Sequence, residues 1–259
     1  MSLNHIARAA AALAAICICT GTAMSASRDD TISAANGPIE VHAVHHASLM
    51  LSWNGKHLLI DPAPPGKGEG DPAEAYAALP KPDVIVYTHS HYDHFNVSIL
   101  KAVIGPDTVI VAPQEVYEQL PAAFQSKAKL MKNGEAAEVD GVPVEAVAMY
   151  NTTPDRTKFH PKGKGNGYVL TLGGKRVYIA GDSEETPETA HLPGIDAAFL
   201  PMNLPYTQTV EAAAKWVKDF KPHVVYPYHF RNPDGSPSDL AAFKKDVGAT
   251  SEVRVLEWY

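Results

Sequence analysis

The stretch Thr88-His89-Ser90-His91-Tyr92-Asp93-His94 decides how the rest of this 259-residue sequence is interpreted. It places three imidazoles and one carboxylate within six residues. It also follows the apolar run Val84-Ile85-Val86-Tyr87, which is typical of a buried strand. Imidazole and carboxylate are ordinary ligands of zinc and related divalent ions, and loops at strand ends commonly carry reactive groups. The pattern predicts a metal site; the alternative is a set of unrelated surface histidines.

The spacing divides these ligands into two sets. His89 and His91 are alternate residues of an extended segment, so both side chains point to the same side. Asp93 and His94 follow where the chain turns toward a neighbouring position, so one short loop can serve two metal ions. Asp93 is also the candidate catalytic residue, because a carboxylate can position a nucleophile and carry a proton.

The flanking sequence alternates β-rich runs with helical patterns. An antiparallel opening is expected at 39–44, 48–53 and 56–60, with Asn54-Gly55 as a hairpin turn. Further strands are expected at 108–111, 142–149, 168–172, 176–180, 197–200 and 224–226, and helices at 98–104, 113–120, 209–220 and 236–246. This order predicts an α/β fold of two mixed β-sheets covered by helices. No proline- or glycine-rich linker divides residues 27–259, so we expect one domain there.

The first 26 residues have the layout of a cleavable secretory signal. Arg8 precedes an apolar run from Ala9 to Cys19, and small residues around Ala26 suit cleavage. A membrane anchor or an N-terminal helix is the alternative, although the run is shorter than the roughly 20 residues that span a bilayer. No later stretch approaches that length. We therefore expect a periplasmic or secreted protein without a membrane span in its mature chain.

Removal of this segment changes the chemistry that is available. Both cysteines, Cys17 and Cys19, lie within it, so the mature chain contains neither a disulfide nor a thiolate ligand. Cleavage removes one of the 22 basic residues and none of the 29 acidic ones, so the formal net charge moves from −7 to −8. Nucleic acid is not an expected partner of such an acidic protein.

The HxHxDH pattern of His89 to His94 resembles the signature of the metallo-β-lactamase superfamily, in which a preceding threonine is common. The similarity extends over most of the chain after residue 26. It implies the αβ/βα sandwich of that superfamily, in agreement with the order of elements above. It also implies that His89 and His91 bind one ion, and that Asp93 and His94 bind a second.

Two later residues match further landmarks of the superfamily. Asp182 follows an expected strand within Gly181-Asp182-Ser183, where many of these hydrolases have an aspartate that bridges two metals. By itself it is equally a turn-forming aspartate. His229 follows an apolar strand and resembles the last histidine ligand; the alternative is a loop histidine that bonds a backbone carbonyl. His223, at the far end of that strand, is expected to be structural.

The sequence departs from the superfamily between these landmarks. Another histidine ligand is usual where this chain has Tyr150-Asn151, and the next histidine is His160. A branch similar to the ascorbate-6-phosphate lactonase-like proteins has a Tyr-Asn followed by such a His-Pro loop. His160 is therefore the candidate ligand and Asn151 a candidate pocket residue. If His160 is instead a surface histidine, the site holds a single metal.

Two segments nearer the N-terminus support the same branch. His46, in Val44-His45-His46-Ala47-Ser48, resembles the histidine of a Gly-His-Ala motif and is expected to line the pocket. Asp61, in Leu59-Ile60-Asp61-Pro62, is expected beneath the metals, where it could orient a ligand histidine through its other ring nitrogen. The alternative for Asp61 is an ordinary Asp-Pro turn.

These residues predict a metal-dependent hydrolase. Two divalent ions, most simply zinc but also manganese or iron, would lower the pKa of bound water to about 7, and the hydroxide would attack an ester, lactone or phosphoester. The alternative is a non-catalytic metal-binding protein on the same fold. The substrate is expected to be a small molecule. The basic residues near His160 either attract an anionic one or form a solvated loop; they are Arg156, Lys158, Lys162 and Lys164.

Overall fold

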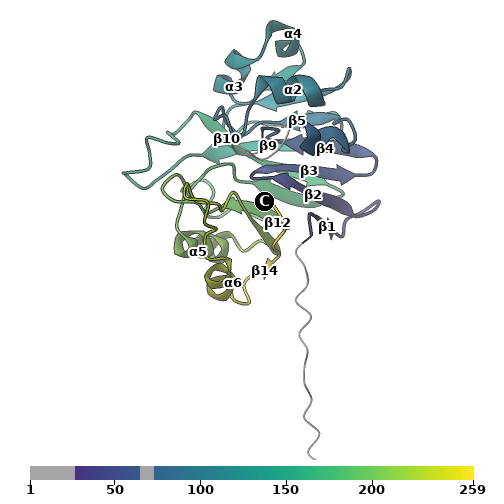
Figure 1. The fold of residues 1–259 in the computed structure, drawn as a ribbon. Helices are drawn as coiled ribbons and strands as arrows, with labels where there is room; N and C mark the ends of the chain where they lie inside the picture. The colour runs from purple at the N-terminus through teal and green to yellow at the C-terminus, as the bar shows by residue number, and fades with distance from the viewer. Residues whose placement is uncertain (1–26, 65–72) are drawn as a thin grey trace, which may run out of the picture.

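The computed structural model describes residues 27–64 and 73–259 (Figure 1). The expected signal segment, residues 1–26, lies outside the described residues. In the described part of the chain, no helix combines the length and apolar character needed to cross a bilayer.

Two seven-stranded sheets form the centre of the fold, and in each sheet neighbouring strands are also consecutive in the sequence. The first sheet contains β1 (Asp29–Ile32), β2 (Ile39–His45), β3 (Ser48–Trp53), β4 (Lys56–Ile60), β5 (Val84–Val86), β6 (Val109–Ala112) and β7 (Ala128–Leu130). The second contains β8 (Ala136–Val139), β9 (Val142–Met149), β10 (Gly165–Leu172), β11 (Lys175–Ile179), β12 (Ala197–Pro201), β13 (Val224–Tyr228) and β14 (Glu252–Val253). Each sheet has antiparallel and parallel pairs, as expected for a mixed sheet.

Helices cover the outer faces of the two sheets. Those of the first half are α1 (Glu74–Ala77), α2 (Val97–Val103), α3 (Gln114–Gln119) and α4 (Ala122–Gln125); those of the second half are α5 (Val210–Phe220) and α6 (Leu240–Val247). Figure 1 shows α2, α3 and α4 beside the first sheet, with α5 and α6 at the opposite end of the molecule. The expected αβ/βα sandwich is confirmed.

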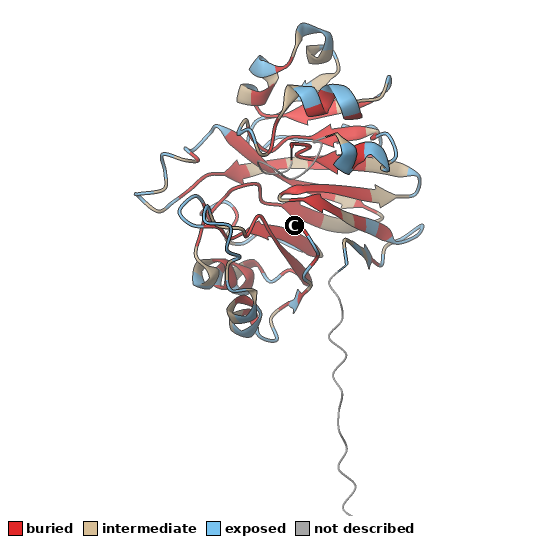
Figure 2. Ribbon diagram, in the orientation of Figure 1, coloured by how far each residue is buried: buried red, intermediate tan, exposed pale blue. Residues whose placement is uncertain are grey.

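Side-chain alternation along the strands supplies both faces of the first sheet. In β4, Leu58 and Ile60 pack in the core between the sheets, whereas Leu59 packs with the apolar side of α2. In β5, Val84 and Val86 face inward in the same way, and Ile85 faces outward. Figure 2 shows the central strands largely buried and the outer helix surfaces exposed.

Several boundaries differ from the sequence expectations. The expected helix at 236–246 begins only at Leu240, because the Asp239 side chain caps it by accepting the Ala242 amide at 2.9 Å, while Arg231 and Pro237 form a β-bridge. Strand β13 continues to Tyr228, which brings His229 directly to its end. The short strands β1, β7, β8 and β14 were not expected.

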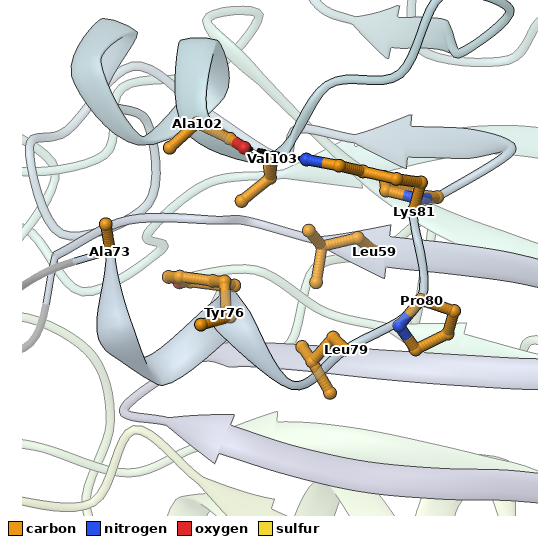
Figure 3. A pocket seen from close by; sticks show the side chains of 10 residues that line it. Leu59, Ala73, Tyr76, Leu79, Pro80, Lys81, Ala102 and Val103 are labelled. Carbon is orange, nitrogen blue, oxygen red and sulfur yellow. Dashed lines mark hydrogen bonds between the residues drawn. The ribbon is translucent and has the colours of Figure 1, made fainter.

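A small apolar cavity of about 250 Å³ lies between α1 and α2 (Figure 3). Leu59, Tyr76, Leu79 and Val103 contribute to its wall. None of the described residues that line it is a histidine or a carboxylate, so it is separate from the candidate metal ligands.

Candidate metal centre

The candidate ligands meet at one edge of the sandwich because four loops reach it. The HxHxDH loop follows β5, and the loop with His160 connects β9 to β10. Asp182 follows β11 and His229 follows β13, and these strands point the same way because each pairs in parallel with β12. Residues far apart in the sequence are therefore brought together by strand topology.

Four side chains form the first group, with one ligand atom from each lying within 4.8 Å of the others: His89, His91, His160 and Asp182. Asp182 Oδ2 lies 3.3 Å from His160 Nε2 and 4.0 Å from His89 Nε2. His160, which the sequence analysis gave as a candidate ligand without assigning it to either ion, thus lies with His89 and His91. His91 is the exposed member, so this side of the group faces solvent.

A second group combines His94, Asp182 and His229 within the same limit. His94 Nε2 lies 3.1 Å from Asp182 Oδ1, and His229 Nε2 lies 3.3 Å from Asp182 Oδ2. Asp93 Oδ2 is 3.4 Å from His229 Nε2. Asp182 belongs to both groups, so its carboxylate stands between two potential ion positions.

The hydrogen bonding of these atoms fits a metal centre. Among the described residues, buried nitrogens of His94, His160 and His229 and Oδ1 of Asp182 have no hydrogen-bond partner, although they face one another at short distances. Buried polar atoms are rarely left in this state, since each costs roughly 1–3 kcal/mol. Divalent ions would satisfy them, and imidazole and carboxylate are suitable donors.

The electrostatics favour a bound cation. Burial lowers the pKa of His89 well below its ordinary value, so the imidazole is neutral as a ligand must be. Burial disfavours the Asp182 carboxylate, but His229 and His94 hold its pKa well below the usual range. Burial likewise opposes charge on His94, yet Asp182 and Asp61 raise its pKa well above the usual value. The two carboxylates therefore attract positive charge to His94, Asp182 on the Nε2 side of the ring and Asp61 on the Nδ1 side.

Asp61 lies beneath the cluster, fully buried. Its Oδ2 is 2.8 Å from His94 Nδ1 and accepts the Thr88 hydroxyl at 2.6 Å, while Oδ1 accepts the Thr88 amide at 2.7 Å. An acceptor at Nδ1 places the imidazole proton there and leaves Nε2 for a ligand bond. These contacts are the ones that the orienting role expected for Asp61 requires.

The two expected pocket residues lie in different surroundings. His46 borders the cluster: its Nε2 is 3.1 Å from Asp93 Oδ2, and its ring centroid is 3.7 Å from that of His229. His46 forms a third group of possible ligands with Asp93 and His229, whereas Asn151 is outside all three groups. Its amide donates to the carbonyls of Arg156 and Tyr206 at 3.0 and 2.7 Å, so it ties the loop with His160 to a neighbouring loop.

Sequence analysis missed Glu184, two residues after Asp182. Its buried carboxylate accepts the amides of Thr152 and Thr153 at 2.8 and 2.6 Å and the Arg156 guanidinium at 2.9 Å. Glu184 thereby fastens the loop that carries His160 to the loop that carries Asp182. Only its proximity to Asp182 in the sequence could have drawn attention to it.

His223 precedes β13, at the opposite end of that strand from His229. Its side chain is 78% exposed and pairs with Asp196 at 3.4 Å. It does not belong to any ligand group in the described chain.

Comparison with known proteins places the site in a family context. A family model described as a beta-lactamase superfamily domain matches residues 40–229, a range that contains every candidate ligand. A UPF0173 metal-dependent hydrolase of Pyrococcus abyssi is 30% identical over 229 residues, covering 85% of this chain and 96% of the relative.

Solved structures agree with this match. A metal-dependent hydrolase candidate from Parabacteroides distasonis is 36% identical with a TM-score of 0.78, covering 90% of this chain and all (100%) of the other. Igni18, a metallo hydrolase of Ignicoccus hospitalis, is 26% identical with a TM-score of 0.70, covering 85% of this chain and 95% of the other. The similarity therefore spans the sandwich and the ligand loops together.

Proposed function

Since the chain belongs to the beta-lactamase superfamily and is a metal-dependent hydrolase, we propose that it holds two divalent ions and hydrolyses a small ester or lactone. His89, His91 and His160 would hold one ion. Asp93, His94 and His229 would hold the other, with Asp182 between the two. The shared position of Asp182, at 3.1 Å from His94 and 3.3 Å from both His160 and His229, is the observation that carries this proposal.

The chemistry divides between the ions and the chain. Bound divalent ions supply Lewis acidity and lower the pKa of water to about 7. Zinc is the proposed metal, with manganese and iron as alternatives, because histidine and carboxylate accept all three. Asp93, partly exposed beside the buried ligands, would orient a nucleophile and carry its proton.

The charges around the loop with His160 favour a neutral substrate over an anionic one. Three of its four cations have carboxylate partners: Arg156 pairs with Glu184, Lys162 with Glu188 and Lys164 with Glu115. The fourth, Lys158, lies over the Phe159 ring. Because paired cations attract an anion weakly, we place a neutral ester or lactone before a phosphoester.

Metal content per chain tests the proposal. Wild-type protein, loaded and desalted, should contain about two ions, and the His160→Ala and Asp182→Ala variants should contain fewer. His223→Ala is the matched control, since it removes an exposed histidine outside the ligand groups. Turnover of neutral lactones and esters is then compared with that of anionic phosphoesters.

Two results would count against this function. Unchanged metal content in the His160 and Asp182 variants would remove both from the ligand set. Two bound ions without turnover of any ester, lactone or phosphoester would favour the alternative, a non-catalytic metal-binding protein on the same fold.

We also propose export of the chain, on sequence grounds alone. The signal expected in residues 1–26 predicts a mature N-terminus near Ser27. N-terminal sequencing of the native protein, together with cell fractionation, tests this, and an uncleaved cytoplasmic product would contradict it.

A further inference from the structure

Tyr259 contacts the metal centre through one intermediate side chain. Its Oη lies 3.1 Å from His46 Nδ1, and His46 Nε2 lies 3.1 Å from Asp93 Oδ2. The Arg231 backbone N–H donates to the same Oη at 3.3 Å. A continuous chain of hydrogen bonds therefore runs from a backbone amide through a phenol and an imidazole to a candidate ligand.

The donors and acceptors in this series of hydrogen bonds determine which group donates to which. A carboxylate only accepts, so the hydrogen bond between His46 and Asp93 is made only when His46 carries its proton at Nε2. A neutral imidazole then has a lone pair at Nδ1, which accepts the hydroxyl of Tyr259. The Tyr259 oxygen accepts the Arg231 amide, and its O–H is left to donate to His46. With this assignment each donor in the series, from the Arg231 amide to His46 Nε2, has an acceptor.

This direction matters because His46 is close enough to bind a metal. One atom each from His46, Asp93 and His229 lie within 4.8 Å of one another, and the His46 and His229 rings are 3.7 Å apart between centroids. Distance alone would admit His46 as a ligand. A nitrogen that carries a proton, however, cannot coordinate a metal ion.

We propose that the Tyr259 hydroxyl holds His46 in the Nε2–H tautomer, which makes His46 a hydrogen-bond donor to Asp93 and excludes it from the metal ligands. The inference rests on the proposed function in one respect, namely that Asp93 serves a metal centre. Tyr259 is in this view a positioning residue that acts through His46.

The surroundings allow the hydroxyl to be removed without disturbing the ring. The Tyr259 ring packs edge-to-face against Phe230 at 5.3 Å, and the Arg231 guanidinium lies 3.9 Å above it. Tyr259→Phe keeps both ring contacts and deletes the two hydrogen bonds of the hydroxyl, the one to His46 and the one from the Arg231 amide. Tyr226→Phe is the matched control, because the Tyr226 hydroxyl bonds Asp30 at 2.8 Å, away from the cluster.

The first experiment reads the tautomer directly in chelated, metal-free protein. Nitrogen-15 NMR of labelled histidine should give His46 a protonated Nε2 and an unprotonated Nδ1 in wild type. Tyr259→Phe should shift it toward a mixture of tautomers, and Tyr226→Phe should not. A wild-type His46 protonated at Nδ1 alone would overturn the proposal, whether or not the protein binds metal.

The second experiment measures zinc affinity by competition with a chelator. Tyr259→Phe should weaken the more weakly bound zinc about three- to tenfold, because a hydrogen bond that orients a ligand partner is lost. In a His46→Ala background the same substitution should have no further effect. Equal losses in both backgrounds would show that Tyr259 does not act through His46. Absence of zinc binding in wild type would instead contradict the proposed function and leave the NMR result to decide the tautomer.

Discussion

The buried carboxylate of Asp61 lies 2.8 Å from His94 Nδ1, on the side of the ring opposite Asp182, which is 3.1 Å from Nε2. His94 is thus held between two carboxylates, one structural and one in the candidate metal centre. An acceptor at Nδ1 favours the tautomer that a ligand histidine needs at Nε2.

Asp61→Asn should weaken metal binding about 10- to 100-fold. The asparagine amide can donate to His94 Nδ1, which moves the imidazole proton to Nε2 and blocks coordination there. Asparagine tolerates the positive φ of 44° at this position, so backbone strain is not the cause. Chelator competition measures the loss.

Asp140→Asn provides the control for this substitution. Asp140 has a similar φ of 48°, but it is an exposed turn residue paired with Lys56. Its replacement should leave metal affinity unchanged. Equal effects of the two variants would mean that Asp61 does not orient His94.

Glu184→Gln should loosen the loop that carries His160. The carboxamide cannot accept from Arg156 and both threonine amides as the carboxylate does, so we expect a loss of about 1–3 kcal/mol in the free energy of unfolding. Metal content should fall toward one ion per chain. Urea unfolding and metal analysis measure the two effects.

Glu185→Gln is the adjacent control. Glu185 pairs with exposed Lys215 at 2.9 Å, and surface pairs of this kind contribute about 0–1 kcal/mol. A variant at 185 as damaging as that at 184 would argue against a specific role for Glu184 in holding the loop.

The contribution of Glu184 should also depend on pH. Burial alone would raise its pKa, but Arg156 and the amides of Thr153 and Thr152 hold it below the ordinary 4.5. A folded-state pKa below the unfolded one gives stability that is complete above about 4.5 and is lost as pH falls through the folded pKa. The difference in unfolding free energy between wild type and Glu184→Gln, measured on chelated protein, should therefore shrink in acid. A difference that grows in acid would contradict this assignment.

Gly181→Ala should damage the site more than its backbone conformation alone explains. A Cβ at Gly181 would lie 2.7 Å from Met149 Sδ and 3.0 Å from Thr88 Cβ, next to Asp182. Gly174→Ala carries a comparable positive φ, 77° against 62°, with open space around it. Backbone strain should lower the free energy of unfolding of each variant by about 1 kcal/mol, and Gly181→Ala should also bind less metal. Thermal unfolding and metal content distinguish strain from crowding.

Local patterns in the sequence predicted most of the fold. Apolar strands and Gly-containing turns follow from short-range chemistry, as at Asn54-Gly55, whose φ values of 48° and 77° match a hairpin turn. The same signal at Asp140-Gly141 was overlooked, and with it strand β8. Strands β1, β7 and β14 have two to four residues each, too few to show a period.

The sequence by itself determined the HxHxDH loop, because those ligands are neighbours in the chain and share one local geometry. It could only nominate His160, Asp182 and His229 as partners, since 66 or more positions separate each of them from His94. Parallel pairing of β11, β12 and β13 brings Asp182 and His229 to one edge, and Glu184 holds the loop of His160 beside them. The contacts of Glu184 and Tyr259 were decided only by tertiary structure, because a hydrogen bond between distant segments leaves no periodic pattern in either segment.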